Sequence, residues 1–155
     1  MEGRRQQLID DVQSAIAGKS AQKDILDAAI RLIDDFCPQF DWSGFYMIEG
    51  NQLVVASYIG HETPHTVIPL NSGICGAAAS QKRSVVVDDV RSDPRFLACS
   101  ITTRSEIVVP LMDGDTVLGE IDIDSNTPKF FTDDDRIMLE AVAEIVVERL
   151  KEIGI

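Results

Sequence analysis

The sequence predicts an α+β domain in which an antiparallel sheet lies between helical layers. Apolar residues recur at helical spacing at both ends of the chain, strand-like runs separated by short turns fill its middle, and one short helix interrupts those strands. The strands carry large apolar groups on both faces, so we expect the sheet to be covered on both sides. With 155 residues, 45% of them hydrophobic, the chain is expected to form a single domain over residues 1–155, its sheet and pocket spanning about residues 41–125.

Two helices are predicted near the N-terminus, over residues 4–17 and 20–37. Ser20 is expected to cap the second helix, which ends before Pro38. Cys37, in the last turn, fits a small buried hydrophobe better than a reactive thiol. The apolar positions at helical spacing are Leu8, Val12, Ile16, Leu26, Ala29, Ile33 and Phe36.

A β-hairpin with a glycine-containing turn is predicted next, over DWSGFYMIEGNQLVVASYIG. Strand alternation puts Trp42, Gly44 and Tyr46 on one face and Phe45 and Met47 on the other. Trp42 and Tyr46 are either plain core residues or, with Gly44 between them, the walls of a slot for a ligand.

Residues 60–72 have no sustained period and are expected to form a loop with a short strand at 66–68. A short helix follows over 74–81, with Cys75 in its first turn. There, either the helix dipole stabilises the Cys75 thiolate, or the cysteine is a small packing residue. Residues 84–87 form a further short strand.

Cys99 lies in a long irregular connection that leads into the apolar strand opened by Glu106. After a tight turn, the return strand places Glu120, Asp122 and Asp124 together on one face. We expect Glu120 to lie on a solvated face. The Cys99 thiol and the carboxylates of Glu106, Asp122 and Asp124 should then lie near one end of a hairpin, which indicates redox chemistry on a small cationic or zwitterionic molecule.

A long final helix is predicted over about residues 132–153. Thr132 and Asp135 give it a start that resembles a capping box. The stripe expected to face the core is Leu139, Val142, Val146 and Leu150.

A formal net charge of −12 argues against nucleic-acid and anionic-membrane partners and favours a basic or zwitterionic ligand. The sequence has neither the roughly 18 apolar residues of a membrane span nor the pattern of a signal peptide, so we expect a cytoplasmic location. Three cysteines without framework spacing indicate free or transiently oxidised thiols. His61 and His65 lack a third soft ligand, and we expect no metal and no other cofactor.

Four separated motifs resemble one family. The runs DWSGFYM, SGICGAA, LACSITTRSEIVVPL and LGEIDIDS, the last followed by FTDDD, are similar to the GAF-domain enzymes called free methionine-(R)-sulfoxide reductases. The similarity covers about residues 36–150. It implies a GAF-like α-β-α sandwich and an oxidoreductase that acts on free methionine sulfoxide with a thioredoxin-like reductant.

The resemblance also implies roles for individual residues. Cys99 matches the family's nucleophile, although Ser100 follows it where aspartate is common. Cys75 matches a second family cysteine and is the candidate resolving thiol, because His65 stands where the family commonly has a third. The residues that match the family's substrate-binding positions are Trp42, Tyr46, Glu106, Asp122 and Asp124.

The chemistry of a sulfoxide sets what such a site must contain. Its sulfur becomes electrophilic when its oxygen receives a proton while a thiolate attacks. Carboxylates crowded in one pocket cannot all ionise cheaply, so Glu106, Asp122 or Asp124 should keep a proton and donate it. Attack by Cys99 gives methionine and a sulfenic acid, which a second thiol converts to a disulfide.

The main alternative is a GAF domain that senses a small ligand or a redox signal without turnover. Cyclic-nucleotide-binding relatives carry an Asn-Lys-Phe-Asp-Glu pattern, of which Asn126, Lys129, Phe130 and Asp134 are a degraded echo. A third alternative is a pure dimerisation module. The terminal helices could also pair two copies of an enzyme into a homodimer.

Overall fold

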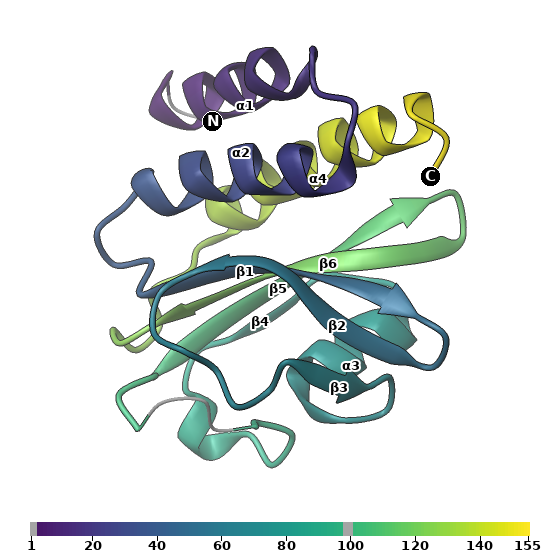
Figure 1. The fold of residues 1–155 in the computed structure, drawn as a ribbon. Coiled ribbons are helices and arrows are strands. Elements are labelled where there is room, and N and C mark those ends of the chain that lie inside the picture. The colour runs from purple at the N-terminus through teal and green to yellow at the C-terminus, as the bar shows by residue number, and fades with distance from the viewer. Residues whose placement is uncertain (1–2, 98–100) are drawn as a thin grey trace.

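The computed structural model describes residues 3–97 and 101–155, so Cys99 lies outside the described residues. Its central element is an antiparallel sheet with the strand order β3-β2-β1-β6-β5-β4 (Figure 1). The elements in chain order are α1 Gly3–Ile16, α2 Gln22–Asp35, β1 Trp42–Glu49, β2 Gln52–Ile59, β3 Val67–Pro69, α3 Gly73–Gln81, β4 Val85–Val87, the 3-10 helix η1 Val90–Ser92, β5 Ser105–Asp113, β6 Thr116–Ser125 and α4 Asp133–Glu152.

Helices cover both faces of the sheet, as predicted. α2 and α4 lie on one face, and α1 packs across these two helices (Figure 1). α3 covers the other face, where it contacts β5 and β6, and the loops between strands lie on the same side. The fold is therefore the predicted α+β sandwich.

Strand alternation separates two groups of buried side chains. Phe45, Ile121 and Ile123 point toward α2 and α4 and form part of the larger apolar core. Trp42 and Tyr46, one residue out of phase with Phe45, point toward α3 and join a smaller cluster that includes Cys75. The chain thus builds an apolar face and a mixed face on the same strands.

Most element bounds agree with the predictions to within two residues. The residue that caps the start of α2 differs from the prediction. Ala21, rather than Ser20, is the N-cap, and no side chain caps the helix. The strand expected at 66–68 is β3, shifted by one residue. The predicted stripe of α4 is buried as expected. Within the described residues, no helix is both long enough and apolar enough to cross a membrane.

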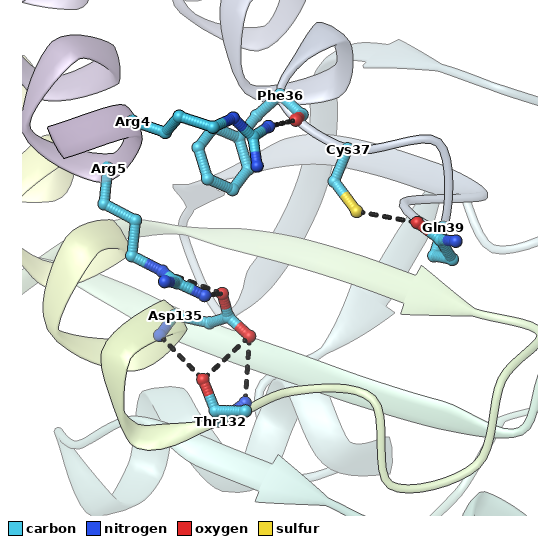
Figure 2. A network of polar contacts seen from close by, with 7 residues as sticks. All are labelled: Arg4, Arg5, Phe36, Cys37, Gln39, Thr132 and Asp135. Atoms are coloured by element: carbon cyan, nitrogen blue, oxygen red, sulfur yellow. Dashed lines mark hydrogen bonds and ion pairs between the residues drawn. The ribbon is translucent and has the colours of Figure 1, made fainter. Parts of the chain in front are cut away.

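The predicted capping box at the start of α4 is confirmed. The backbone N–H of Thr132 donates to Asp135 Oδ2 over 2.9 Å, and the backbone N–H of Asp135 donates to Thr132 Oγ1 over 3.3 Å. Asp135 also forms an ion pair with Arg5 of α1, with 2.9 Å between Arg5 Nη2 and Asp135 Oδ1 (Figure 2).

Cys37 follows the end of α2. Its Sγ donates to Gln39 Oε1 over 3.0 Å (Figure 2). Cys37 is half-buried rather than fully buried, and it lies against the apolar core.

Candidate active site

The aromatic walls of the site come from β1. Trp42 and Tyr46 are 1% and 2% exposed, and their ring centroids lie 6.2 Å apart with the rings tilted by 33°. Gly44 lies between them in sequence, and a Cβ atom there would come within 2.4 Å of Trp42 Cη2. The absence of a side chain at Gly44 therefore lets the indole lie flat along the strand. The sequence left open whether Trp42 and Tyr46 are plain core residues or the walls of a ligand slot. Both descriptions fit, because the two rings are buried and also line a cavity.

Both aromatic residues also hold the loop that follows β2. Trp42 Nε1 donates to the backbone carbonyl of His61 over 3.1 Å, and the Tyr46 hydroxyl donates to that of His65 over 2.8 Å. Tyr58 stacks on Trp42 at a centroid distance of 5.5 Å, with 20° between the ring planes. The loop containing His61 and His65 is thereby fixed beside the aromatic walls.

The three predicted carboxylates meet on the same face, as expected. Glu106 on β5 lies opposite Asp124 on β6, and Asp122 lies opposite Gly44 on β1. All three side chains are buried, with exposures of 5% or less. The strand register therefore places Asp124 opposite Trp42 and Asp122 opposite Gly44, beside the aromatic walls.

Cys75 reaches the same group from α3. It lies in the first turn of that helix, as predicted, and its Sγ donates to Asp122 Oδ2 over 3.3 Å. Burial is the main cause that raises the pKa of the Cys75 thiol well above its usual value, and the charges of Asp122, Glu120 and Glu106 add to this effect. Cys75 is therefore a protonated thiol in this arrangement, which opposes the stabilisation that a helix start alone would give a thiolate.

Burial also acts on the carboxyl groups of Glu106 and Asp122. Burial, followed by the charges of Asp122 and Asp124, raises the pKa of Glu106 well above its usual value. Burial raises the pKa of Asp122 as well, but hydrogen bonds from Glu106 and Cys75 oppose that rise. Asp122 therefore accepts hydrogen bonds from its neighbours, while Glu106 is the better proton holder.

Together these groups enclose a small cavity. Its volume is about 20 Å³, room for about one water molecule. This volume is smaller than a ligand the size of an amino acid. The lining residues are Trp42, Tyr46, Thr63, His65, Ile68, Gly73, Ile74, Cys75, Phe96, Leu97, Glu106, Asp122 and Asp124.

The expectation for Glu120 was wrong. Its side chain is 0% exposed, because β6 is a central strand and α3 covers the face to which the side chain points. Burial, followed by the charge of Asp122, raises the pKa of Glu120 well above its usual value. The alternation E-I-D-I-D placed Glu120 on the same face as the two aspartates, and that pattern could have indicated its burial with them.

One group of side chains has a spacing that a metal ion could use. The ligand atoms of Cys75, Glu106 and Asp122 lie within 4.8 Å of one another. The thiol proton is already bonded to Asp122, and the raised pKa of Glu106 favours a protonated cluster. These protons would have to leave before a metal ion could bind, and the expectation of no metal stays a prediction.

The structure brings six of the predicted site residues together: Cys75, Trp42, Tyr46, Glu106, Asp122 and Asp124. The seventh, Cys99, is outside the described residues. Leu97, two positions before Cys99 in the sequence, lines the cavity, as does Phe96.

Comparison with known proteins identifies relatives over most of the chain. Residues 23–150 match the model of the GAF domain family. The free methionine-R-sulfoxide reductase of Escherichia coli is 30% identical over 125 residues, which are 81% of this chain and 75% of the relative. The reductase of Neisseria meningitidis, solved in complex with its substrate, superposes with a TM-score of 0.90 at 31% identity and covers 95% of this chain and 88% of its own.

A sensor-like protein is equally similar in structure. A putative GAF sensor protein from Burkholderia vietnamiensis superposes with a TM-score of 0.91 at 31% identity, covering 97% of this chain and 96% of its own. Overall similarity therefore does not separate the two kinds of relative, and the chemistry of the pocket must do so.

Proposed function

The chain belongs to the GAF domain family, and from that premise we propose that it reduces free methionine-R-sulfoxide to methionine. The observation that carries the proposal is the buried group of acids Glu106, Asp122 and Asp124 beside the aromatic walls. A sensor needs only affinity for its ligand. A reductase also needs a proton donor, and buried carboxyl groups with raised pKa values supply one.

The pocket matches the two ends of the proposed substrate. Trp42 and Tyr46 offer apolar ring surface to the methyl group on the sulfoxide sulfur. Asp122 and Asp124 offer carboxylate oxygens to the α-ammonium group. A pocket that encloses both ends has no space for the flanking peptide bonds of a protein-bound methionine sulfoxide.

We assign the proton donor to Glu106. Its carboxyl group is almost fully buried, and ionised neighbours on β6 oppose its own ionisation. Proton transfer from Glu106 to the sulfoxide oxygen withdraws electrons from the sulfur and makes it open to attack. Asp122, which accepts a hydrogen bond from Glu106, stabilises the donor in its protonated form.

Cys99 is the proposed nucleophile. Its thiolate attacks the sulfur, the sulfur–oxygen bond breaks, and the oxygen passes to Cys99 as a sulfenic acid. The sulfoxide sulfur gains two electrons and leaves as methionine, while the Cys99 sulfur loses two. The thiol proton of Cys99 replaces the proton that Glu106 donated.

Cys75 is the proposed resolving thiol, because it lines the pocket, whereas Cys37 lies against the apolar core on the other side of the sheet. Its sulfur attacks the Cys99 sulfenic acid, the sulfur–oxygen bond breaks as the disulfide forms, and the departing hydroxide receives the Cys75 thiol proton by way of Asp122 and leaves as water. Asp122 accepts hydrogen bonding from Cys75 and is placed to take the thiol proton. A thioredoxin-like dithiol then reduces the disulfide.

A recycling test follows from this scheme. Cys75→Ser should keep most of its turnover with dithiothreitol, which reaches the sulfenic acid directly, and lose turnover with thioredoxin. Mass spectrometry of oxidised wild type should find a Cys75–Cys99 bond. A cross-link between two copies of Cys99 would instead assign resolution to a second subunit.

The alternative is a GAF domain that binds the same zwitterion without turnover. It is favoured by the likeness to the putative sensor from Burkholderia vietnamiensis. Such a domain would bind methionine sulfoxide tightly and release it unchanged.

Substrate turnover tests the function directly. Free methionine-R-sulfoxide, the free S isomer and a peptide containing methionine sulfoxide are each incubated with the protein and dithiothreitol, and methionine is quantified. We expect turnover of the free R isomer alone. Cys37→Ser is the matched control and should behave as wild type. Binding of the R isomer without methionine release would favour the sensor, and equal rates on the peptide would contradict the enclosed pocket.

A further inference from the structure

Several buried acids lie together on the α3 side of the sheet without a basic side chain paired to them. Glu106, Glu120 and Asp122 are each 5% exposed or less. Within residues 3–97 and 101–155, no lysine or arginine forms an ion pair with any of these three. Burial of a carboxylate costs much free energy unless a proton or a cation neutralises it. This group therefore favours a small cation.

Some oxygens of the group have no hydrogen-bond partner. Asp122 lines the cavity, and its Oδ1 has no partner among the described residues. Within the same part of the chain, neither oxygen of Glu120 has one, although Glu120 is not in the cavity wall. Buried polar atoms in folded proteins are nearly always paired, so an unpaired carboxylate oxygen on a cavity-lining side chain indicates a site for a further ligand.

Three ligand atoms converge at this point from three elements. Cys75 on α3, Glu106 on β5 and Asp122 on β6 each place one ligand atom within 4.8 Å of the other two. Cys75 Sγ and Asp122 Oδ2 are 3.3 Å apart. Two such ligands of one tetrahedral zinc ion lie about 3.5 Å apart, given bonds of about 2.3 Å to sulfur and about 2.0 Å to oxygen. The longer separations must shorten by side-chain rotation when an ion binds.

The chemistry of these ligands selects the class of ion. A thiolate is a soft ligand that favours zinc over calcium or magnesium, and zinc also accepts carboxylate oxygens. The cavity beside the three residues has a volume of about 20 Å³, room for a water molecule in the fourth tetrahedral position. His65, Phe96 and Leu97 in its wall are half-buried, so the cavity lies close to the protein surface.

We propose that Cys75, Glu106 and Asp122 bind a zinc ion that reversibly inhibits this pocket. On binding, the S–H bond of Cys75 breaks, the sulfur keeps the electron pair and donates it to zinc, and the proton passes to solvent. The two carboxyl groups likewise release any proton that they hold and donate oxygen lone pairs to the ion. No electrons are transferred, and removal of zinc returns the protons.

This ion is an inhibitor and not a cofactor. The expectation of no metal was drawn from His61 and His65 in one loop, whereas the three ligands proposed here come from α3, β5 and β6. Their positions in the sequence have no metal-ligand spacing, so only the fold brings them together.

The inhibition rests on the proposed function. Bound zinc occupies Asp122, which offers its carboxylate to the substrate ammonium group, and Glu106, which donates the proton. It also occupies Cys75, the proposed resolving thiol. Zinc and free methionine-R-sulfoxide should therefore exclude one another from the pocket.

Zinc binding is measured first, without substrate. The background carries Cys37→Ser and Cys99→Ser, so that Cys75 is its only thiol. Titration against a fluorescent zinc chelator should find one ion per chain. Addition of Cys75→Ser should weaken the affinity by more than about 100-fold, beyond the loss that follows when a group that only orients a ligand is removed. An affinity unchanged by Cys75→Ser would overturn the proposal.

Variants of the acids in the same background separate ligands from general negative charge. Asp122→Asn and Glu106→Gln keep the side-chain shape, and each should weaken zinc binding at least about tenfold. Glu148→Gln removes the same charge on the exposed side of α4, outside this cavity, and should leave the affinity unchanged. Urea denaturation confirms that each variant is folded. Equal effects of all three changes would assign binding to net charge and overturn the proposal.

Cobalt(II) in place of zinc reports the ligands directly. A thiolate bonded to cobalt gives a charge-transfer absorption band that carboxylate and water ligands do not give. The background with Cys75 as its only thiol should show this band, and Cys75→Ser should lose it. Cobalt binding without the band would overturn the assignment of Cys75 as a ligand, and with it the proposal.

Competition with substrate tests the inhibition. A single turnover without reductant is used, because dithiothreitol itself binds zinc. Wild type and the control Cys37→Ser should release little methionine when saturated with zinc and regain full release after excess chelator. Release unaffected by saturating zinc would overturn the proposal. If wild type releases no methionine even without zinc, the proposed function fails, and the zinc and cobalt titrations still decide whether the metal site exists.

Discussion

The two faces of the sheet are built from alternate residues of the same strands, and they differ in what their burial costs. Toward α2 and α4, β6 presents Ile121 and Ile123, whose burial stabilises the fold. Toward α3, the residues between and beside them are Glu120, Asp122 and Asp124, whose burial costs free energy unless protons or partners neutralise them. The apolar face toward α2 and α4 therefore stabilises the fold. The acid face toward α3 lowers the stability of the protein and holds the proposed reactive site.

The largest expected effect on stability belongs to the apolar face. Ile121→Ala removes a fully buried side chain from the core between the sheet and its helices. We expect the free energy of unfolding to fall by about 3 kcal/mol, as measured by urea denaturation. A loss below about 1 kcal/mol would mean that this core adjusts easily and that the contrast between the faces is weaker than stated.

A substitution on the acid face should show the opposite pattern. Glu106→Gln removes the proposed proton donor but keeps the shape and a hydrogen-bond donor, so kcat should fall about 100-fold. Stability should be equal to that of wild type or higher, since the amide cannot ionise. Kinetics and urea denaturation of the same preparation check both parts. A stable variant with wild-type kcat would show that another acid supplies the proton.

The pH dependence of stability sharpens the same comparison. The pKa values of Glu106, Glu120 and Asp122 are raised in the folded state, so the folded protein binds protons more tightly than the unfolded chain. Stability should therefore fall as pH rises above the ordinary pKa values of these groups in the unfolded chain, about 4 to 4.5, because the buried groups are then forced to ionise.

Glu106→Gln should reduce that slope, and Glu148→Gln on the exposed surface should not change it. Urea denaturation at several pH values measures the slopes. If the stability of wild type rises with pH over this range, the acids are ionised in the folded state and the account of this face is wrong.

A smaller effect is expected where an aromatic wall meets the loop after β2. Tyr46→Phe keeps the ring and removes the hydroxyl that donates to the His65 carbonyl. Stability should fall by about 1 kcal/mol, the usual value of one hydrogen bond. Because the loop also lines the cavity, KM should rise with little change in kcat. A larger loss of stability than that of Ile121→Ala would reverse the comparison between the faces.

Much of this architecture could be predicted from the sequence. The alternation of Trp42 and Tyr46 with Phe45 predicted which side chains share a face, and Thr132 with Asp135 predicted the start of α4. These features depend on residues close in sequence, because strand alternation and helix capping are both set by neighbouring residues.

The failures concern contacts between distant segments. Glu120 was expected in solvent although the alternation places it on one face with Asp122 and Asp124, because the contact between α3 and β6 joins segments far apart in the sequence. The hydrogen bond from Cys75 to Asp122 joins residues 47 positions apart and was equally invisible, so the raised pKa of the thiol could not be predicted. At the start of α2, the boundary lies at Ala21, one residue after the better capping residue Ser20, and no side chain caps the helix.

The claim that the acid face performs sulfoxide reduction through Cys99 is tested most directly by a single turnover. Wild type and Cys99→Ser are each incubated with free methionine-R-sulfoxide without any reductant, methionine is quantified, and cysteine sulfenic acid is trapped with a selective reagent. Wild type should release about one methionine per chain and carry oxidised Cys99, while Cys99→Ser should release none. Methionine release by Cys99→Ser at the level of wild type would contradict the account.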